Sequence, residues 1–161
     1  MRALCAAPPI GPHIASPSNM DSLQRFVGTW AVEAALPVDP AQPLQGRCTF
    51  EWMQGGQLLI QRTEAPAPVP SSLAVIAPSS TGKGYTLHYF DSRGVVRLYD
   101  MTFEDDTWQL LRTKQDFSAL DFCQRFIGTF EDGGRIIRGA WEKSPDGRDW
   151  TLDFPLTYRR T

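Results

Sequence analysis

Cysteine is scarce in this 161-residue sequence, and the few cysteines do not form a disulfide framework. Cys5, Cys48 and Cys123 are odd in number and widely spaced, without a C-x-x-C pair. Small disulfide-stapled domains carry an even number of cysteines in close patterns. Free thiols are the rule in a reducing compartment, so the sequence favours a cytoplasmic protein.

Long apolar runs and an excess of one charge are also absent. No stretch approaches the roughly 20 apolar residues that a membrane-spanning helix needs. Sixteen Lys and Arg against 18 Asp and Glu give a formal net charge of −2. Nucleic acids and anionic lipids attract strongly basic proteins, so we expect neither a nucleic-acid nor a membrane partner. Histidine, cysteine and acidic residues show no metal-ligand spacing, so no metal site is expected.

Aromatic residues, glycine and proline are plentiful and indicate an all-β domain. Five Trp, nine Phe and four Tyr accompany 13 Gly and 13 Pro. Aromatic residues favour strands, and Gly and Pro favour tight turns. The length fits one domain with a sizeable core. We predict a disordered leader over residues 1–20, which prolines interrupt, and one domain over residues 21–161.

Turn signals divide the domain into about ten short strands, the pattern of a sandwich or barrel. One or two helical turns are expected near residues 21–26, with Asp21 or Ser22 as N-cap. Hairpin turns at residues 91–94, 104–107, 132–133 and 144–147 favour antiparallel neighbours. The fold class predicted is all-β, a single antiparallel barrel with strands over residues 28–36, 47–53, 58–64, 73–77, 85–90, 95–104, 108–113, 122–131, 135–143 and 148–159.

Turn lengths predict which side chains share a face, because directly opposed residues of antiparallel strands point the same way. Folding at residues 91–94 sets His88 opposite Arg97, and folding at residues 104–107 sets Met101 opposite Leu110. The predicted inward set is largely aromatic and apolar, Phe90, Met101, Trp108, Trp141, Trp150 and Leu152 included. Its polar members are His88, Arg97, Tyr99, Arg112, Gln124 and Gln61. The predicted solvent face holds Arg47, Glu51, Arg125, Arg138, Glu142 and Asp153.

The strand that begins at Gly28 carries a G-x-W motif that resembles the first strand of lipocalins and calycins. In that family the Trp plugs one end of the barrel and a basic residue from the last strand packs on it. The resemblance implies this role for Trp30 with Arg159 or Arg160. Further segments resemble a group of uncharacterised bacterial, largely actinobacterial, lipocalin-like proteins. These segments lie at residues 99–101, 108–110, 124–130 and 139–144.

Two related barrels bear on the ligand. Nitrobindin-like haem barrels use G-x-W-x-G-x-G and a C-terminal histidine, and this chain has neither the later glycines nor that histidine. We therefore expect no haem and no other cofactor. Fatty-acid-binding proteins hold a carboxylate with an R-x-Y pair in the last strand. Arg97-Leu98-Tyr99 has this spacing in the middle of the chain.

The predicted function is the binding of a small, mostly apolar molecule with an acidic or carbonyl end. Arg97, Tyr99, Arg112 and His88 would fix its polar end, and the further ligand-binding residues are Met101, Trp108, Gln124, Gln61 and Trp141. One alternative is an isomerase, cyclase or dehydratase with His88 as general base and Tyr99 stabilising an oxyanion. A filled barrel that acts as an interaction domain is a further alternative. Independently of the function, a homodimer is one of the assemblies the sequence leaves open.

The polar candidates also have structural interpretations. His88 could be a hydrogen-bonded histidine of the barrel wall, since a fold does not imply a function. Arg97 and Arg112 could be neutralised by Asp100, Asp116 or Asp121 rather than by a ligand.

Overall fold

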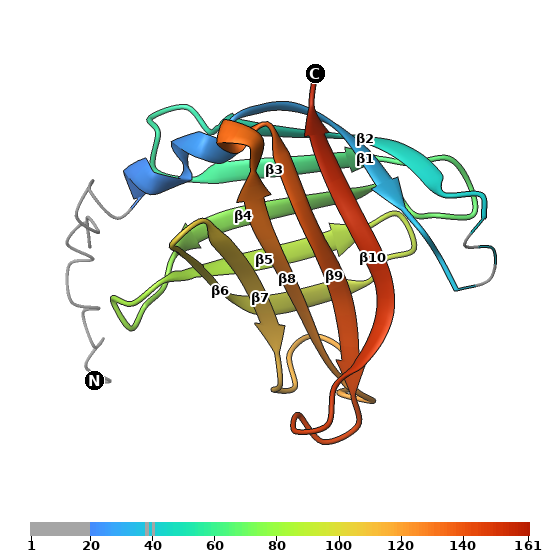
Figure 1. The fold of residues 1–161 in the computed structure, drawn as a ribbon. Coiled ribbons are helices and arrows are strands. Elements are labelled where there is room, and N and C mark those ends of the chain that lie inside the picture. Colours follow the sequence, from blue (N-terminus) through green and yellow to red (C-terminus); the bar gives the residue numbers. More distant parts are fainter. Residues whose placement is uncertain (1–19, 38, 40) are drawn as a thin grey trace, which may run out of the picture.

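The computed structural model describes residues 20–161 except 38 and 40, and shows one closed antiparallel barrel of ten strands (Figure 1). Each strand pairs with its neighbours in sequence, and β1 closes the barrel against β10. The predicted all-β fold with a short N-terminal helical turn is confirmed. The elements are η1 (Ser22–Phe26), β1 (Gly28–Ala34), β2 (Leu44–Trp52), β3 (Leu59–Glu64), β4 (Ser72–Pro78), β5 (Tyr85–Asp91), β6 (Val96–Glu104), β7 (Thr107–Arg112), β8 (Cys123–Glu131), η2 (Asp132–Gly134), β9 (Ile136–Ser144) and β10 (Thr151–Arg160).

The leader predicted over residues 1–20 lies outside the described residues except for Met20. Met20 is 4% exposed and belongs to the hydrophobic core. Asp21 occupies the N-cap position of η1 without a capping hydrogen bond from its side chain.

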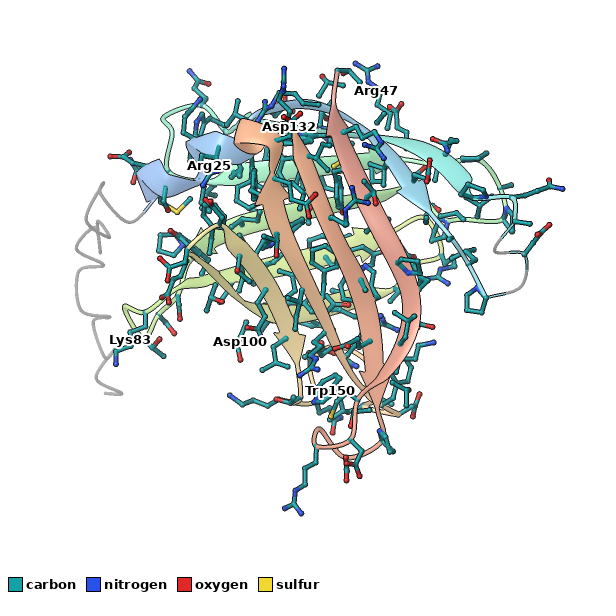
Figure 2. The ribbon with its side chains drawn as sticks, in the orientation of Figure 1. Arg25, Arg47, Lys83, Asp100, Asp132 and Trp150 are labelled. Carbon is teal, nitrogen blue, oxygen red and sulfur yellow. The ribbon has the colours of Figure 1, made fainter. Side chains whose placement is uncertain are left out.

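An aromatic plug closes one end of the barrel. Phe26 of η1 is fully buried, and its ring lies 4.9–5.4 Å from the rings of Phe50, Phe103, Trp108 and Phe130. Most of these ring pairs meet edge to face, which is a favoured aromatic geometry. Figure 1 shows η1, η2 and the C-terminus together at this end. Figure 2 labels Arg25 and Asp132 there, and Trp150 at the opposite end.

Trp30 and Arg160 form the contact that the lipocalin resemblance implies. The Trp30 side chain is fully buried, and its indole nitrogen donates to the Phe26 carbonyl at 2.8 Å. The Arg160 guanidinium lies 4.3 Å from the Trp30 ring centroid. It also donates to the carbonyls of Val27 at 2.7 Å and Arg25 at 2.6 Å. The last strand thereby fastens η1 over the closed end.

Arg160→Met is expected to lower the free energy of unfolding by about 1–2 kcal/mol, because a cation–π contact and two charge-assisted hydrogen bonds disappear at an exposed site. Urea titration followed by tryptophan fluorescence measures the change. Arg159→Met, at the neighbouring exposed position, is the matched control. Equal stability of the two variants would show that Arg160 does not fasten η1.

The hairpin from β6 to β7 follows the predicted register. Asp105 and Asp106 have φ values of 47° and 63°, as a two-residue type I′ turn requires. Phe103 therefore pairs with Trp108, and Met101 with Leu110. The predicted inward positions on these two strands are confirmed.

The hairpin from β5 to β6 differs from prediction by one residue. Phe90 pairs with Val96 and His88 pairs with Leu98, so Tyr89 rather than His88 lies opposite Arg97. The turn is longer than predicted because the Asp91 carboxylate accepts bonds from the backbone nitrogens of Arg93 and Val95 at 2.9 and 3.3 Å. A one-residue slip moves every side chain of a strand to the other face. The inward positions predicted for His88 and Phe90 are therefore wrong.

A bulge in β10 changes a second prediction. Leu152 pairs with Glu142 and Phe154 with Trp141, so Asp153 is an extra residue on its strand. Leu152 consequently points outward and is 65% exposed, whereas Asp153 lines the barrel interior. Trp150 lies under the Arg125 guanidinium, 4.3 Å away. The inward placement of Leu152 and Trp150 and the outward placement of Asp153 are thus wrong.

Candidate functional site

The half of the barrel away from the plug holds a cavity of about 550 Å³. Its mouth lies where β1–β2, β3–β4 and β5–β6 connect, at Leu36, Val69 and Arg93, and where β8 begins, at Phe122. Trp108 of the plug also lines the cavity. Clefts of 300–1,000 Å³ with apolar walls and a few polar groups are typical of small-molecule sites.

The cavity wall consists of two arcs of different chemistry. The aromatic arc, contributed by β5–β10 and the residue before β8, comprises Tyr89, Tyr99, Trp108, Phe122, Phe126, Trp141, Phe154 and Tyr158. The small-residue arc, contributed by β1–β4, carries aliphatic or small side chains that include Val32, Ala34, Leu44, Gly46, Ser72 and Ala74. Each arc is continuous because these strands are neighbours in the barrel.

Three polar side chains of the aromatic arc form one hydrogen-bonded group. Arg97 Nη1 and the Tyr99 hydroxyl both donate to Gln124 Oε1 at 2.8 Å. The three residues come from β6 and β8, on either side of β7. Burial raises the pKa of the Tyr99 hydroxyl, although the hydrogen bond and charge of Arg97 oppose the shift. Tyr99 therefore remains a neutral donor at physiological pH.

The two bonds to Gln124 fix the orientation of its amide. Arg97 can only donate, so the amide must turn its oxygen toward the guanidinium. Its Nε2 group is left as a donor for which the described residues supply no acceptor. Arg97 Nε is buried and also has no acceptor in the described part of the chain. This cluster therefore contains two donors without acceptors among the described residues, beside a positive charge, and of these Arg97 Nε is fully buried.

Within the described part of the chain, Arg97 has no carboxylate partner. The other cations of the cavity each have one. Lys143 Nζ lies 2.9 Å from Asp153, and Arg93 Nη2 lies 2.6 Å from Asp91. Both Arg97 and Lys143 lie near the Phe122 ring. The Arg97 guanidinium is 5.5 Å and Lys143 Nζ is 5.3 Å from the ring centroid. The charge that remains for a ligand is the one on Arg97.

Arg112, predicted as a ligand anchor, forms an ion pair with Asp116 instead. It lies opposite Gln124 across the β7–β8 ladder, but its Nε and Nη2 donate to the two oxygens of Asp116 at 2.8 and 3.0 Å. Its side chain is 2% exposed and does not line the cavity. Neutralisation by Asp116 was one of the structural interpretations, and the geometry supports it in place of a ligand contact.

Two further predicted site residues lie away from the cavity. His88 is on the outer wall, where its Nε2 lies 3.5 Å from the Thr86 hydroxyl, so it does not face the cavity. Met101 is 1% exposed within the core. The structure brings the other six to the cavity wall: Arg97, Tyr99, Trp108, Gln124, Gln61 and Trp141.

Sequence reasoning missed Tyr89, Lys143 and Asp153 as cavity residues. Tyr89 was placed outside by the one-residue error in the β5–β6 turn, and Asp153 by the bulge. Lys143 lies two residues after Trp141 on the same strand and therefore on the same face, which is the signal that could have identified it.

The buried thiol of Cys48 is not a nucleophile at neutral pH. Burial raises its pKa to about 11, while hydrogen bonds from Thr63 and Gln61 lower it. Cys48 and Cys123 are free thiols. Within the described residues, no three His, Cys, Asp or Glu side chains gather as metal ligands. No helix over the same residues has the length and apolarity to cross a membrane.

Comparison with known proteins supports the fold alone. The crystal structure of Rv2717c from M. tuberculosis is similar to this chain with a TM-score of 0.58 and 14% sequence identity. The match covers 89% of this chain and 97% of that one. No protein-family model matches the sequence, and no curated protein matches it. A solved structure thus shares the small β-barrel fold predicted from the strand and turn pattern, and such a barrel is consistent with small-molecule binding.

Proposed function

We propose that the protein binds a small, mostly apolar molecule with an anionic end, and that Arg97 holds this end. The observation that carries the proposal is the guanidinium of Arg97, which lines the cavity and has no carboxylate partner among the described residues. A partly buried charge without a counter-ion is costly, and a ligand carboxylate would offset that cost. Planar guanidinium groups suit carboxylates because they can donate two parallel bonds.

Gln124 and Tyr99 support the same ligand chemistry. Their bonds hold the guanidinium and the amide in place, so the Nε2 group of Gln124 is a second donor for the same anion. The remaining wall is mainly apolar, and its area would cover the body of the ligand.

Arg97→Met is expected to weaken the binding of an apolar acid about tenfold to a hundredfold, because one or two charge-assisted hydrogen bonds disappear while much of the stem packing remains. Titration calorimetry with decanoate and 2-naphthoate, each beside its neutral primary amide, measures the effect. Wild-type protein should prefer the acid over the amide, and Arg97→Met should lose that preference.

Arg138→Met is the matched control, since Arg138 lies on the outer wall and pairs with Glu131 at 3.2 Å. It should bind each acid as the wild type does. The proposal fails if neither acid binds, or if Arg97→Met binds them as tightly as Arg138→Met.

A further inference from the structure

Trp141 links the hydrogen-bonded group of Arg97, Tyr99 and Gln124 to the rest of the aromatic arc. The Trp141 ring lies 5.6 Å from the Tyr99 ring and 5.4 Å from the Phe126 ring. Tyr99 in turn donates to Gln124, beside Arg97. Trp141 therefore lies one ring away from the group that would bind the acid, while Phe122 contacts the Arg97 guanidinium itself.

Aromatic contacts continue from Trp141 toward the plug. Phe126 lies 4.9 Å from Trp108, and Trp108 lies 5.8 Å from Tyr158. The wall that faces these rings is the small-residue arc, where Ala34 and Ala74 offer little bulk. Phe126 and Trp108 are each only 1% exposed and pack behind Trp141, which is half-buried, so Trp141 is the ring of this chain of contacts that faces the free space.

We infer that the bound molecule is an aromatic carboxylic acid, with its ring system against Trp141 and its carboxylate at Arg97 and Gln124. This inference rests on the proposed function and adds the chemical class of the ligand body. Ring-on-ring contacts favour an aromatic ligand by about two- to tenfold beyond the area buried. A rigid ring also loses less conformational freedom on binding than an alkyl chain of similar size.

The test compares 2-naphthoate with decanoate, two apolar acids of similar heavy-atom number and equal charge. Titration calorimetry on the full chain should give tighter binding of 2-naphthoate. Trp141→Leu should weaken 2-naphthoate about three- to tenfold and leave decanoate within about twofold, because it removes the ring but keeps an apolar side chain. Trp141→Phe should recover part of the loss.

Trp150→Leu is the matched control, because Trp150 lies outside the cavity against Arg125. It should leave the binding of both acids unchanged. Circular dichroism shows whether each variant retains its β-structure.

The possible failures are distinguishable. If decanoate binds as tightly as 2-naphthoate, or if Trp141→Leu weakens both acids equally, the aromatic class is wrong while the anion site at Arg97 stands. If neither acid binds the wild type, the proposed function itself fails, and the inference with it.

Discussion

Asp116→Asn is expected to lower the free energy of unfolding by about 3–5 kcal/mol, because it leaves the buried guanidinium of Arg112 without its counter-ion. The two side chains are 2% and 4% exposed. Removing one partner of a buried ion pair costs more than the pair itself contributes, since the remaining charge stays desolvated. Urea unfolding at pH 7 measures the change.

The Asp116 carboxylate also organises the connection from β7 to β8. It accepts bonds from the backbone nitrogens of Leu98 at 2.9 Å and Ser118 at 3.1 Å. An asparagine amide can replace only one of the two oxygens as an acceptor. This connection leads to Phe122 at the cavity mouth and to Gln124, which accepts from Arg97, so we also expect Asp116→Asn to weaken the proposed ligand binding.

The pH dependence of stability provides a second readout of the same pair. Hydrogen bonds from Arg112 hold the pKa of Asp116 well below its ordinary range. The unfolded chain therefore takes up a proton near pH ~4, before the folded chain does. Stability from this group is fully present above pH ~5 and is lost as the pH falls below ~4.

Wild-type protein should accordingly lose more stability between pH 6 and pH 3 than Asp116→Asn does. Asp100→Asn is the matched control, because Asp100 is exposed on the outer wall (Figure 2). An equal loss in the wild type and in Asp116→Asn would show that this carboxylate is not stabilised by Arg112.

The sequence predicts the barrel well because turn chemistry is local. Asp105 and Asp106 tolerate positive φ, so the β6–β7 register follows from four residues of sequence. The β5–β6 turn has equally clear composition, but its length depends on how many backbone nitrogens the Asp91 side chain binds. Composition alone does not give that number, and the resulting error displaced His88 and with it the predicted general base.

The candidate site could be predicted only where the register was correct. Arg97, Tyr99 and Gln124 were placed on one face, and the structure joins them by hydrogen bonds. Which arginine would be free was not predictable, because it depends on the path of the connection that carries Asp116 to Arg112. Ion pairs across an irregular loop leave no periodic pattern in a sequence.

Gly139→Ala is expected to destabilise the barrel by about 3 kcal/mol, the upper end of the usual cost of overpacking. A Cβ at this position would lie 2.5 Å from the Ile127 carbonyl oxygen and 2.7 Å from both Gly128 Cα and the Phe126 ring. Two of these three atoms belong to the β8 backbone, which cannot move without disturbing the ladder. The midpoint of thermal unfolding should fall by about 6–12 °C.

Gly128, directly opposite in the ladder, is the informative comparison. The atoms nearest to a Cβ there belong to side chains, the Phe126 ring at 2.7 Å and Ile137 Cγ2 at 3.1 Å. Gly128→Ala should therefore cost less, about 1–2 kcal/mol, and adding Phe126→Leu should restore part of the loss. The same second change should not rescue Gly139→Ala, whose obstacles are backbone atoms.

Ala140→Ser, one residue further on the outer face of β9, controls for a single added atom and should unfold near the wild-type midpoint. If Phe126→Leu rescues Gly139→Ala as fully as it rescues Gly128→Ala, then the ring alone was the obstacle and the backbone contact is not limiting.

The two glycines also shape the cavity, because the absence of a Cβ at each gives the Phe126 ring its place beside Trp141. A methyl group at Gly128 should displace that ring and weaken the binding of an aromatic acid more than that of an aliphatic one.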